Sequence, residues 1–288
     1  MDISQLIVTG IANGCVYGLV ALGFVLIYKA TEMVNFAQGD IMMLGAFIAF
    51  TLSAQFDMPY LLVVPGTIII MAAFGMMLER GILRPMIGEP PFAVLMLTIG
   101  LGFVLRAIAG TIWGHQPNQL ITPYSGGVLE FVGIRLDYEK LVIVGGTAVL
   151  CTLMFLFFKF TRVGVAMQAA SQNQLAAYYV GIPVGRVVSI TWAISAAVAA
   201  AAALMVAPLW WIEPGLGLVG IKAFVAAIVG GFGSLPGAII GGIAIGLVEQ
   251  LVGYTVPGFG ETGAYIFLLL MLFIRPEGIL ATMQKKKV

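Results

Sequence analysis

The sequence predicts an all-α, polytopic membrane protein that forms a single transmembrane domain over residues 1–288. Two observations support this fold class. Hydrophobic residues make up 61% of the chain and charged residues only 9%, whereas globular domains average about half and about a quarter. Apolar runs of roughly 20 residues also recur, which is the length that a helix needs to cross a hydrocarbon core of about 30 Å. A membrane β-barrel would instead show alternating segments of about 10 residues.

The apolar runs predict nine membrane spans of unequal length. The seventh is short for a full crossing, so we expect eight or nine transmembrane helices with broken or re-entrant elements. The predicted spans cover residues 4–28, 38–55, 60–78, 92–113, 141–158, 187–206, 218–232, 236–253 and 264–274.

Lysine and arginine residues gather in alternate loops between these spans, as Lys29, Arg84, Lys159 and Arg275 do. Short loops rich in positive charge lie on the cytoplasmic side, so the N-terminus is predicted outside and the C-terminus inside. The longest outside loop, about residues 114–140, contains the only histidine, His115. It has no cysteine or carboxylate at metal-ligand spacing, so we predict no metal site. The net charge of +1 gives no indication of nucleic-acid binding.

The first span carries Gly10, Gly14 and Gly18, which lie four residues apart. Glycines at this spacing line one helix face and allow another backbone to approach closely. The pattern is compatible with helix packing inside the protein and with an oligomer contact, and the first is favoured because it is the commoner use of such a face.

A polar segment precedes the second span, and its members are Asn35, Phe36, Gln38, Gly39 and Asp40. Asn35 and Gln38 have the spacing of a capping box, so a helix is expected to begin here. Asp40 lies near that start, where a negative charge suits the helix dipole. The segment is therefore either a capped helix entering the membrane or a discontinuous helix that faces a polar cavity on a substrate pathway.

Three charged residues fall inside predicted spans. Arg106 lies in the middle of the fourth span, where it either serves a function or extends its side chain toward the outer interface. Lys222 and Glu249 lie about four residues inside the outer ends of two adjacent spans. If these spans form an antiparallel hairpin, both charges lie at one depth, so we predict a membrane ion pair between them.

A partly polar helix over about residues 163–181 is the longest soluble-looking segment of the chain, and basic residues flank it. A glycine and a proline end it, at Gly181 and Pro183. A protein that only conducts has little need of such a helix, so we expect a soluble partner to push on it. The residues predicted to make this contact are Gln168, Ala169, Ala170, Ser171, Asn173, Ala176 and Gly181.

A glycine-rich turn over residues 230–237 joins two short predicted helices and contains Phe232 and Ser234. No Lys-Ser or Lys-Thr follows it, so it is not a phosphate-binding loop, and any ATP hydrolysis must come from another polypeptide. Non-helical backbone at membrane depth must be buried or line a cavity. We therefore expect substrate to pass between this turn and the segment from Asn35 to Asp40.

Several of these stretches resemble the permease subunits of branched-chain amino-acid ABC importers. The resemblance rests on Asn35-Phe-Ala-Gln-Gly-Asp40, on the polar helix ending in Gly181-Ile182, on Lys222-Ala-Phe224 with the glycine-rich turn, and on Arg275-Pro-x-Gly278. It covers nearly the whole chain in the same order. One departure is Gln168, where the family commonly has an arginine.

The resemblance implies a multi-pass subunit of the bacterial inner membrane with a periplasmic N-terminus. The implied partners are a second, related permease, two cytoplasmic ATPases that hold ATP and Mg, and a periplasmic binding protein that delivers leucine, isoleucine or valine. This chain itself would bind no cofactor and would not be an enzyme. Relatives in the wider family carry urea, short amides or simple sugars. A stand-alone channel and an ion-coupled carrier remain alternatives, although the carrier should show more buried acidic residues.

Overall fold

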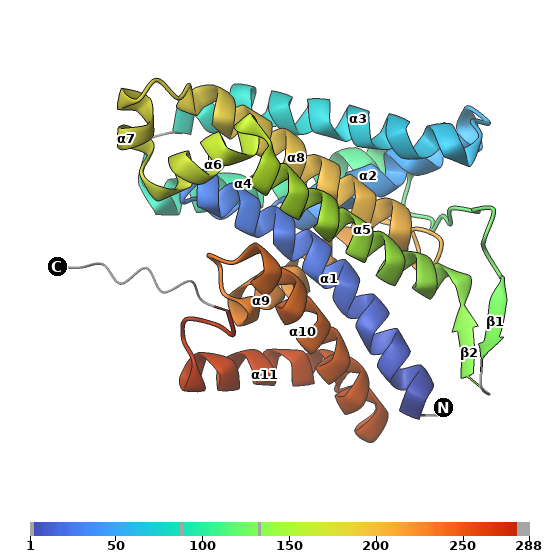
Figure 1. The fold of residues 1–288 in the computed structure, drawn as a ribbon. Coiled ribbons are helices and arrows are strands. Elements are labelled where there is room, and N and C mark those ends of the chain that lie inside the picture. The colour runs from blue at the N-terminus through green and yellow to red at the C-terminus, as the bar shows by residue number, and fades with distance from the viewer. Residues whose placement is uncertain (1–2, 87–88, 132–133, 281–288) are drawn as a thin grey trace.

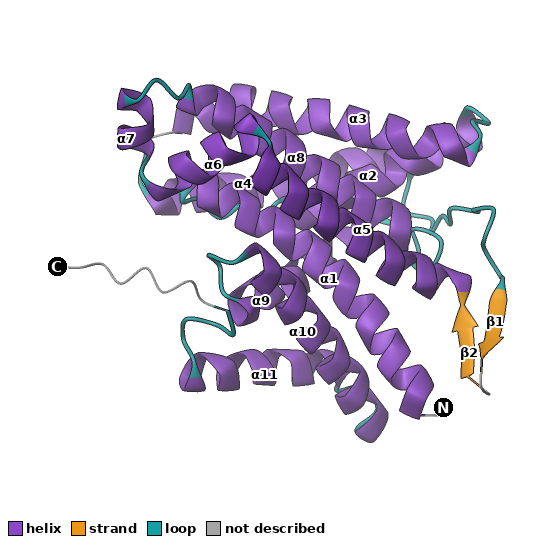
Figure 2. Cartoon of the chain, viewed as in Figure 1, coloured by secondary structure: helices purple, strands orange, loops and turns teal. Residues whose placement is uncertain are grey.

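The computed structural model describes residues 3–86, 89–131 and 134–280, and most of them are helical (Figures 1 and 2). The helices are α1 (Ile3–Thr31), α2 (Gln38–Phe50), α3 (Tyr60–Leu78), α4 (Pro91–Trp113), α5 (Tyr138–Phe160), α6 (Arg162–Gln172), α7 (Gln174–Tyr179), α8 (Val184–Val206), α9 (Val219–Gly230), α10 (Leu235–Thr255) and α11 (Gly260–Ile274).

Irregular helical turns extend several of these helices. α2 continues through a π-helical turn, η1 (Thr51–Gln55), and α3 continues through a π-helical turn, η2 (Glu79–Leu83), and a 3-10 turn, η3 (Arg84–Met86). A 3-10 turn, η4 (Pro214–Leu218), leads into α9.

The predicted polytopic membrane fold is confirmed at the level of long apolar helices. In the described residues six helices are long and apolar enough to cross a membrane: α1, α3 with its extension, α4, α5, α8 and α10. Shorter apolar helices cover Pro214–Gly230 and Gly260–Ile274. Every predicted span coincides with a helix, but α2, α9 and α11 are short at a rise of about 1.5 Å per residue. The count of eight or nine crossings and the orientation therefore stay predictions.

Two features differ from the predicted all-α chain. The loop predicted over residues 114–140 contains a short hairpin, in which β1 (Val128–Phe131) pairs antiparallel with β2 (Ile134–Asp137). The single polar helix predicted over residues 163–181 is two helices, α6 and α7, which meet at Asn173. Asn173 has an extended backbone, and its side-chain oxygen accepts a hydrogen bond from the N–H of Ala176 at 2.9 Å. Asparagine competes in this way with helix continuation and starts a new helix instead.

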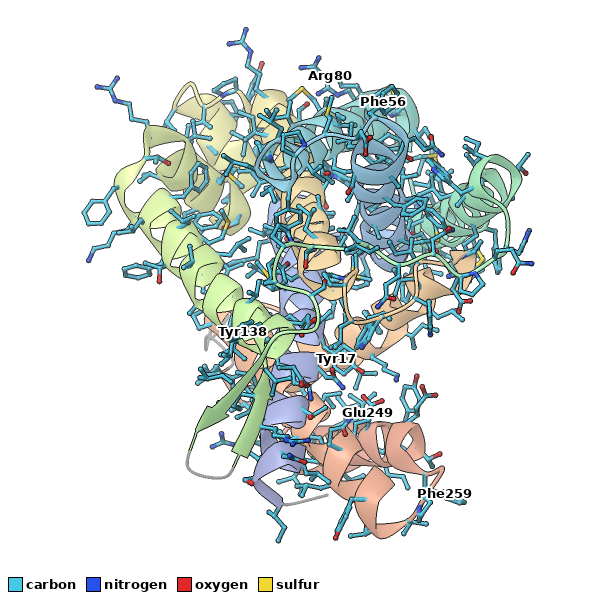
Figure 3. All side chains as sticks on the ribbon, turned by 90° about the vertical axis from the view of Figure 1, so that its right-hand side faces the viewer. Tyr17, Phe56, Arg80, Tyr138, Glu249 and Phe259 are labelled. Carbon is cyan, nitrogen blue, oxygen red and sulfur yellow. The ribbon has the colours of Figure 1, made fainter. Side chains whose placement is uncertain are left out.

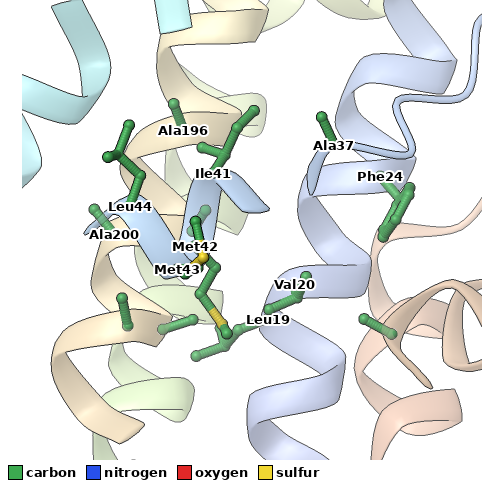
Figure 4. Close-up of a cluster of buried hydrophobic side chains, with 14 of the residues drawn as sticks. Leu19, Val20, Phe24, Ala37, Ile41, Met42, Met43, Leu44, Ala196 and Ala200 are labelled. Atoms are coloured by element: carbon green, nitrogen blue, oxygen red, sulfur yellow. The ribbon is translucent and has the colours of Figure 1, made fainter. Parts of the chain in front are cut away.

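α1 and α8 form the centre of the molecule. In their most apolar stretches 89% and 83% of residues are buried, against at most 33% in α3, α4, α5 and α10. α2 packs between α1 and α8, and Figure 4 shows side chains of all three helices meeting there. Small residues of α8 such as Ala196 and Ala200 leave room for the larger Met42 and Ile41 of α2.

The two ends of the molecule carry different elements. The N-terminal end of α1 and the β1–β2 hairpin lie at one end, which we call the hairpin end, and α6 and α7 lie at the other (Figure 1). Near the α6–α7 end, residues after α11 close off α9. The N–H groups of Ile279 and Leu280 donate to the carbonyls of Val229 and Gly230 at 2.8 and 3.1 Å. These bonds satisfy carbonyls that the end of α9 would otherwise leave unpaired.

The glycine repeat of α1 serves packing inside the protein. A Cβ built at Gly14 would lie 2.5 Å from Cα of Ile243 and 2.7 Å from the carbonyl oxygen of Gly242, both on α10. A Cβ at Gly246 would in turn lie 2.4 Å from the carbonyl oxygen of Gly10. The backbones of α1 and α10 therefore touch, which only glycine permits at these positions.

This contact predicts a large difference between two glycine substitutions. Gly14→Val should destabilise the protein by about 1–3 kcal/mol, because the added atoms meet the backbone of α10. Gly145→Val is the matched control, since a Cβ at this glycine of α5 meets nothing within 4 Å. The measurement is the apparent melting temperature in detergent. Equal melting temperatures for the two variants would contradict the close approach of α1 and α10.

Candidate functional site

The segment between α1 and α2 is held by a network of buried polar side chains. The Asn35 side chain accepts a hydrogen bond from the N–H of Ala37 at 3.1 Å and donates one to Oε1 of Gln38 at 3.3 Å. Gln38 also accepts from the Ser195 hydroxyl of α8 at 3.2 Å. Asn35 and Gln38 are at most 1% exposed. The segment thus leaves helical geometry without leaving an unpaired side-chain polar group.

The predicted capping box is wrong in detail. α2 begins at Gln38, its N-cap is Ala37, and no side chain caps it. Asn35 lies two residues before this N-cap, so its oxygen accepts from the N–H of Ala37, as in an Asx turn. Phe36 is half-buried, and its N–H donates to Thr98 of α4 at 3.2 Å. This hydrogen bond to Thr98 holds the segment against α4.

Asp40 and Arg106 form an ion pair inside the helical domain. Nε of Arg106 donates to Oδ1 of Asp40 at 2.5 Å, and Nη2 donates to Oδ2 at 3.3 Å. Asp40 is buried, whereas the Arg106 side chain is 28% exposed. The sequence analysis considered the two residues separately and missed the pair. The available signal was their opposite charge inside two predicted spans, because a charge at membrane depth requires a partner.

Two glycines make room for the Asp40 carboxylate. A Cβ at Gly102 of α4 would lie 2.4 Å from Oδ2, and one at Gly217 of η4 would lie 2.1 Å from Oδ1. Gly39 meets the same turn, since its Cβ would lie 2.2 Å from the carbonyl oxygen of Gly217. The start of α2 and the turn before α9 are therefore in backbone contact.

A cluster of five aromatic side chains lies beside this segment. Phe224 of α9 is at its centre, with ring centroids 4.8 Å from Phe36, 5.7 Å from Phe24 and 5.6 Å from Phe232. Tyr28 of α1 completes the cluster at 4.9 Å from Phe232. The structure thus connects the two phenylalanines singled out in the sequence, Phe36 and Phe232, through Phe224. The sequence analysis missed Phe24, Tyr28 and Phe224 as members of one cluster, because they lie inside uniformly apolar helices.

The glycine-rich turn between α9 and α10 is tightly packed. The Ser234 hydroxyl accepts a hydrogen bond from the N–H of Gly237 at 3.1 Å, so Ser234 is the N-cap of α10. A Cβ at Gly230 would lie 2.0 Å from the carbonyl oxygen of Gly237. Ser234 is 9% exposed. Its observed role is therefore to start α10, which is separate from the polar network around Gln38.

The α6–α7 segment presents one buried face and one exposed face. Thr161 caps α6 by accepting from the N–H of Gly164 at 2.9 Å. Ala170 is only 2% exposed and packs inside the protein, so its predicted role in a partner contact is not supported. Of the other predicted contact residues, Ala169 and Ser171 are half-buried, and four are exposed: Gln168, Asn173, Ala176 and Gly181.

Exposed apolar side chains on α7 were not singled out in the sequence. Leu175, Tyr178 and Tyr179 are 65%, 67% and 77% exposed, and Val180 follows them at 77%. They form a small apolar surface on an otherwise polar segment.

Lys222 of α9 lies at the centre of a charged group that also includes Glu249 of α10 and Glu261 of α11. Its Nζ is 2.7 Å from Oε1 of Glu249 and 2.7 Å from Oε1 of Glu261. The hydroxyl of Tyr17 donates to the other oxygen of Glu249 at 2.8 Å, and Figure 3 shows these two residues side by side. The proposed partners Lys222 and Glu249 therefore touch, and the structure adds Glu261 and Tyr17 to them.

In the described residues there is no group of three or more His, Cys, Asp or Glu side chains that could hold a metal ion. Both cysteines, Cys15 and Cys151, are free thiols. The chemical groups gathered at the starts of α2 and α10 are aromatic rings and hydrogen-bonded polar side chains.

The charged group around Lys222 predicts an asymmetry between two substitutions. Lys222→Met leaves Glu249 without its cation, so it should cost about 1–3 kcal/mol. Glu249→Gln should cost less, because Lys222 keeps Glu261. The double variant should be no less stable than Lys222→Met alone, as expected for residues in one network. Melting temperatures of the three variants in detergent test this. Simple addition of the two single losses would show that the residues act independently.

Comparison with known proteins identifies the family. Residues 6–275 match the family model described as branched-chain amino acid transport system / permease component. LivH of Salmonella typhimurium, a high-affinity branched-chain amino acid transport system permease protein, is 31% identical, with 99% of this chain and 97% of that protein covered. BraD of Pseudomonas aeruginosa, described in the same words, is 32% identical with the same coverage.

Two more distant matches agree with this result. The probable branched-chain amino acid transport permease protein LivH of Methanocaldococcus jannaschii is 30% identical, with 93% of this chain and 89% of that protein covered. PsaBC from Streptococcus pneumoniae, solved in complex with Fab, has a TM-score of 0.52 at 17% identity, and the match covers 95% of this chain and 92% of that one. It supports the fold alone. The family resemblance seen in the sequence is confirmed, and the chain belongs to the family of branched-chain amino acid transport system permease components.

Proposed function

We propose that this chain is a transmembrane permease subunit of an ATP-driven ABC importer that passes leucine, isoleucine or valine from a periplasmic binding protein into the cytoplasm. The observation that carries the proposal is the match to the permease family over residues 6–275. In this proposal a second, related permease completes the membrane part. Two cytoplasmic ATPases hold ATP and Mg, and this chain hydrolyses nothing itself.

The proposed orientation puts the hairpin end outside and the α6–α7 end in the cytoplasm of a bacterial cell, with the chain in the inner membrane. The distribution of charge supports it. Lys29, Arg84, Arg162 and Arg186 all belong to helix ends or turns near α6 and α7. Positive charge in short loops favours the cytoplasmic side. The periplasmic binding protein would then approach the hairpin end.

α6 and α7 are proposed to receive the push from an ATPase subunit. The exposed Leu175, Tyr178 and Tyr179 supply an apolar contact surface for it. The buried face of α6 supports transmission into the membrane, because Met167 and Ala170 belong to one cluster with residues of α1 and α8. The Gln174 side chain also donates to the carbonyl of Ala30, at the end of α1, at 2.8 Å. A displacement of α6–α7 would therefore move α1 and α8 together.

Substrate is proposed to pass where the segment Asn35 to Asp40 meets α9 and the glycine-rich turn. The aromatic cluster around Phe224 would close this route at rest and open as α9 moves away from Phe36. Its rings would give a branched aliphatic side chain apolar walls, while Asn35, Gln38 and Ser195 would offer the few polar groups that such a site needs. Asp40 is already paired with Arg106, so it is less suited to binding a coupling ion.

Substitutions on the exposed face of α7 test the ATPase contact. Leu175→Glu and Tyr179→Glu should reduce ATP-dependent uptake of radiolabelled leucine at least tenfold, because a charge in an apolar interface must be desolvated. The amount of folded protein in the membrane should not change, since both side chains are exposed. Tyr179→Phe is the matched control, because it keeps an apolar ring at the same exposed position, and it should transport normally. Normal uptake in both α7 variants would rule out this surface as the contact.

Cysteine probes test the proposed route. In a background without native cysteines, Gln38→Cys and Phe224→Cys should react slowly with a small aqueous thiol reagent at rest. With ATP, binding protein and leucine, their reaction should speed up as the aromatic cluster opens. Ala203→Cys is the control for Gln38→Cys, because both residues are 0% exposed and Ala203 lies on α8 away from the cluster. Probes that stay unreactive during transport would place these positions in a permanent core.

A further inference from the structure

A cavity of about 450 Å³ lies at the α6–α7 end, between the extension of α3 and the start of α8. Three arginines line it, Arg80, Arg84 and Arg186, together with Tyr178 of α7 and Ser189 of α8. We propose that this cavity binds the phosphate-bearing head group of an anionic phospholipid. The proposal requires membrane insertion but not the substrate proposed above.

One wall of the cavity is rigid. Nε and Nη2 of Arg84 donate to the two carboxylate oxygens of Glu79 at 3.0 and 3.1 Å. Nη2 also donates to the Ser189 hydroxyl at 2.8 Å and to the carbonyl of Gly185 at 3.1 Å. Glu79 is 1% exposed. These four hydrogen bonds join the extension of α3 to the start of α8 and hold this wall of the cavity within the chain.

The cavity carries excess positive charge. Glu79 balances Arg84, whereas Arg80 and Arg186 are exposed and have no ion-pair partner among the residues described. Three guanidinium groups and one carboxylate leave two positive charges. Arginine binds phosphate with two parallel hydrogen bonds and is more weakly hydrated than lysine, so this pair suits a phosphate better than a metal or a neutral sugar.

An apolar stripe on α3 leads to the cavity. Ile69, Ala73, Met77 and Arg80 follow one another at intervals of four, four and three residues, which places them on one helix face. The first three are exposed, with Ile69 and Met77 at 68% and 62%. In Figure 3 Arg80 projects outward at the rim of the molecule. An acyl chain could lie along this stripe while its phosphate reaches Arg80 and Arg186.

The stripe favours a lipid over an acidic segment of a soluble protein. Basic pockets between membrane helices on the cytoplasmic side are a recurring type of site for anionic lipid head groups. A soluble partner would account for the arginines but would leave the adjoining apolar face uncovered. Because Tyr178 belongs to α7, a bound lipid would also hold the α7–α8 turn, and transport would depend on anionic lipid.

Native mass spectrometry of the full-length chain, purified and delipidated, provides the test. Titration with phosphatidylglycerol should show tighter binding than titration with phosphatidylcholine. In Arg80→Gln/Arg186→Gln the affinity for phosphatidylglycerol should fall about fivefold for each arginine removed. Arg162→Gln is the matched control, since Arg162 is an exposed arginine at the start of α6 that does not line the cavity. Arg80→Lys/Arg186→Lys should keep most of the binding and so exclude misfolding as the cause.

Three results would overturn the proposal. The first is equal binding of the two lipids, and the second is unchanged phosphatidylglycerol binding in the double glutamine variant. The third is displacement of the lipid by millimolar inorganic phosphate, which would indicate a site for a free anion. If instead the double glutamine variant loses an ATPase subunit while lipid binding is unchanged, the cavity is a protein contact. The lipid-binding readings depend on neither leucine uptake nor an ATPase subunit, so they are independent of the proposed function.

Discussion

The hydrocarbon core of a membrane offers no hydrogen-bond partner, so each buried polar group of this protein must find one within the chain. In the described residues no buried side-chain nitrogen or oxygen lacks a partner. Inside the helices threonines meet this requirement locally, as when Thr67 and Thr147 donate to the carbonyls four residues back. Between helices the partners come from distant parts of the chain. The polar residues therefore mark where separate elements must meet.

Close backbone packing is the second constraint, and glycine makes it possible. α1 meets α10 through their glycines, and the start of α2 meets η4 through Gly39 and Gly217. α9 packs against α1, α2, α10 and α11. The N–H groups of Ile279 and Leu280, after α11, donate to the last carbonyls of α9. The carbonyls at the end of this short helix are then paired within the chain. Its position brings Phe224 against Phe36, which is the geometry on which the proposed route depends.

The α6–α7 end combines two kinds of surface. α6 packs through Met167 and Ala170 onto α1 and α8, the two most buried long helices, whereas α7 exposes tyrosines. Beside α7 the Glu79–Arg84–Ser189 group ties α3 to α8. Motion applied to this end would therefore reach the centre of the protein through α1 and α8. The proposed ATPase contact and the proposed lipid site are therefore both connected to α8.

The sequence by itself determined the membrane class, the positions of the apolar helices and the family, because apolar run length and short motifs are local properties. It also indicated the contact of Lys222 with Glu249, since two adjacent spans form a hairpin whose register follows from counting residues. The pair of Asp40 with Arg106 and the cluster around Phe224 were decided by tertiary structure. Their members are far apart in the chain or hidden among other apolar residues. The break at Asn173 and the burial of Ala170 belong to the same class, because side-chain capping and packing against α1 and α8 override the periodicity of a single polar helix.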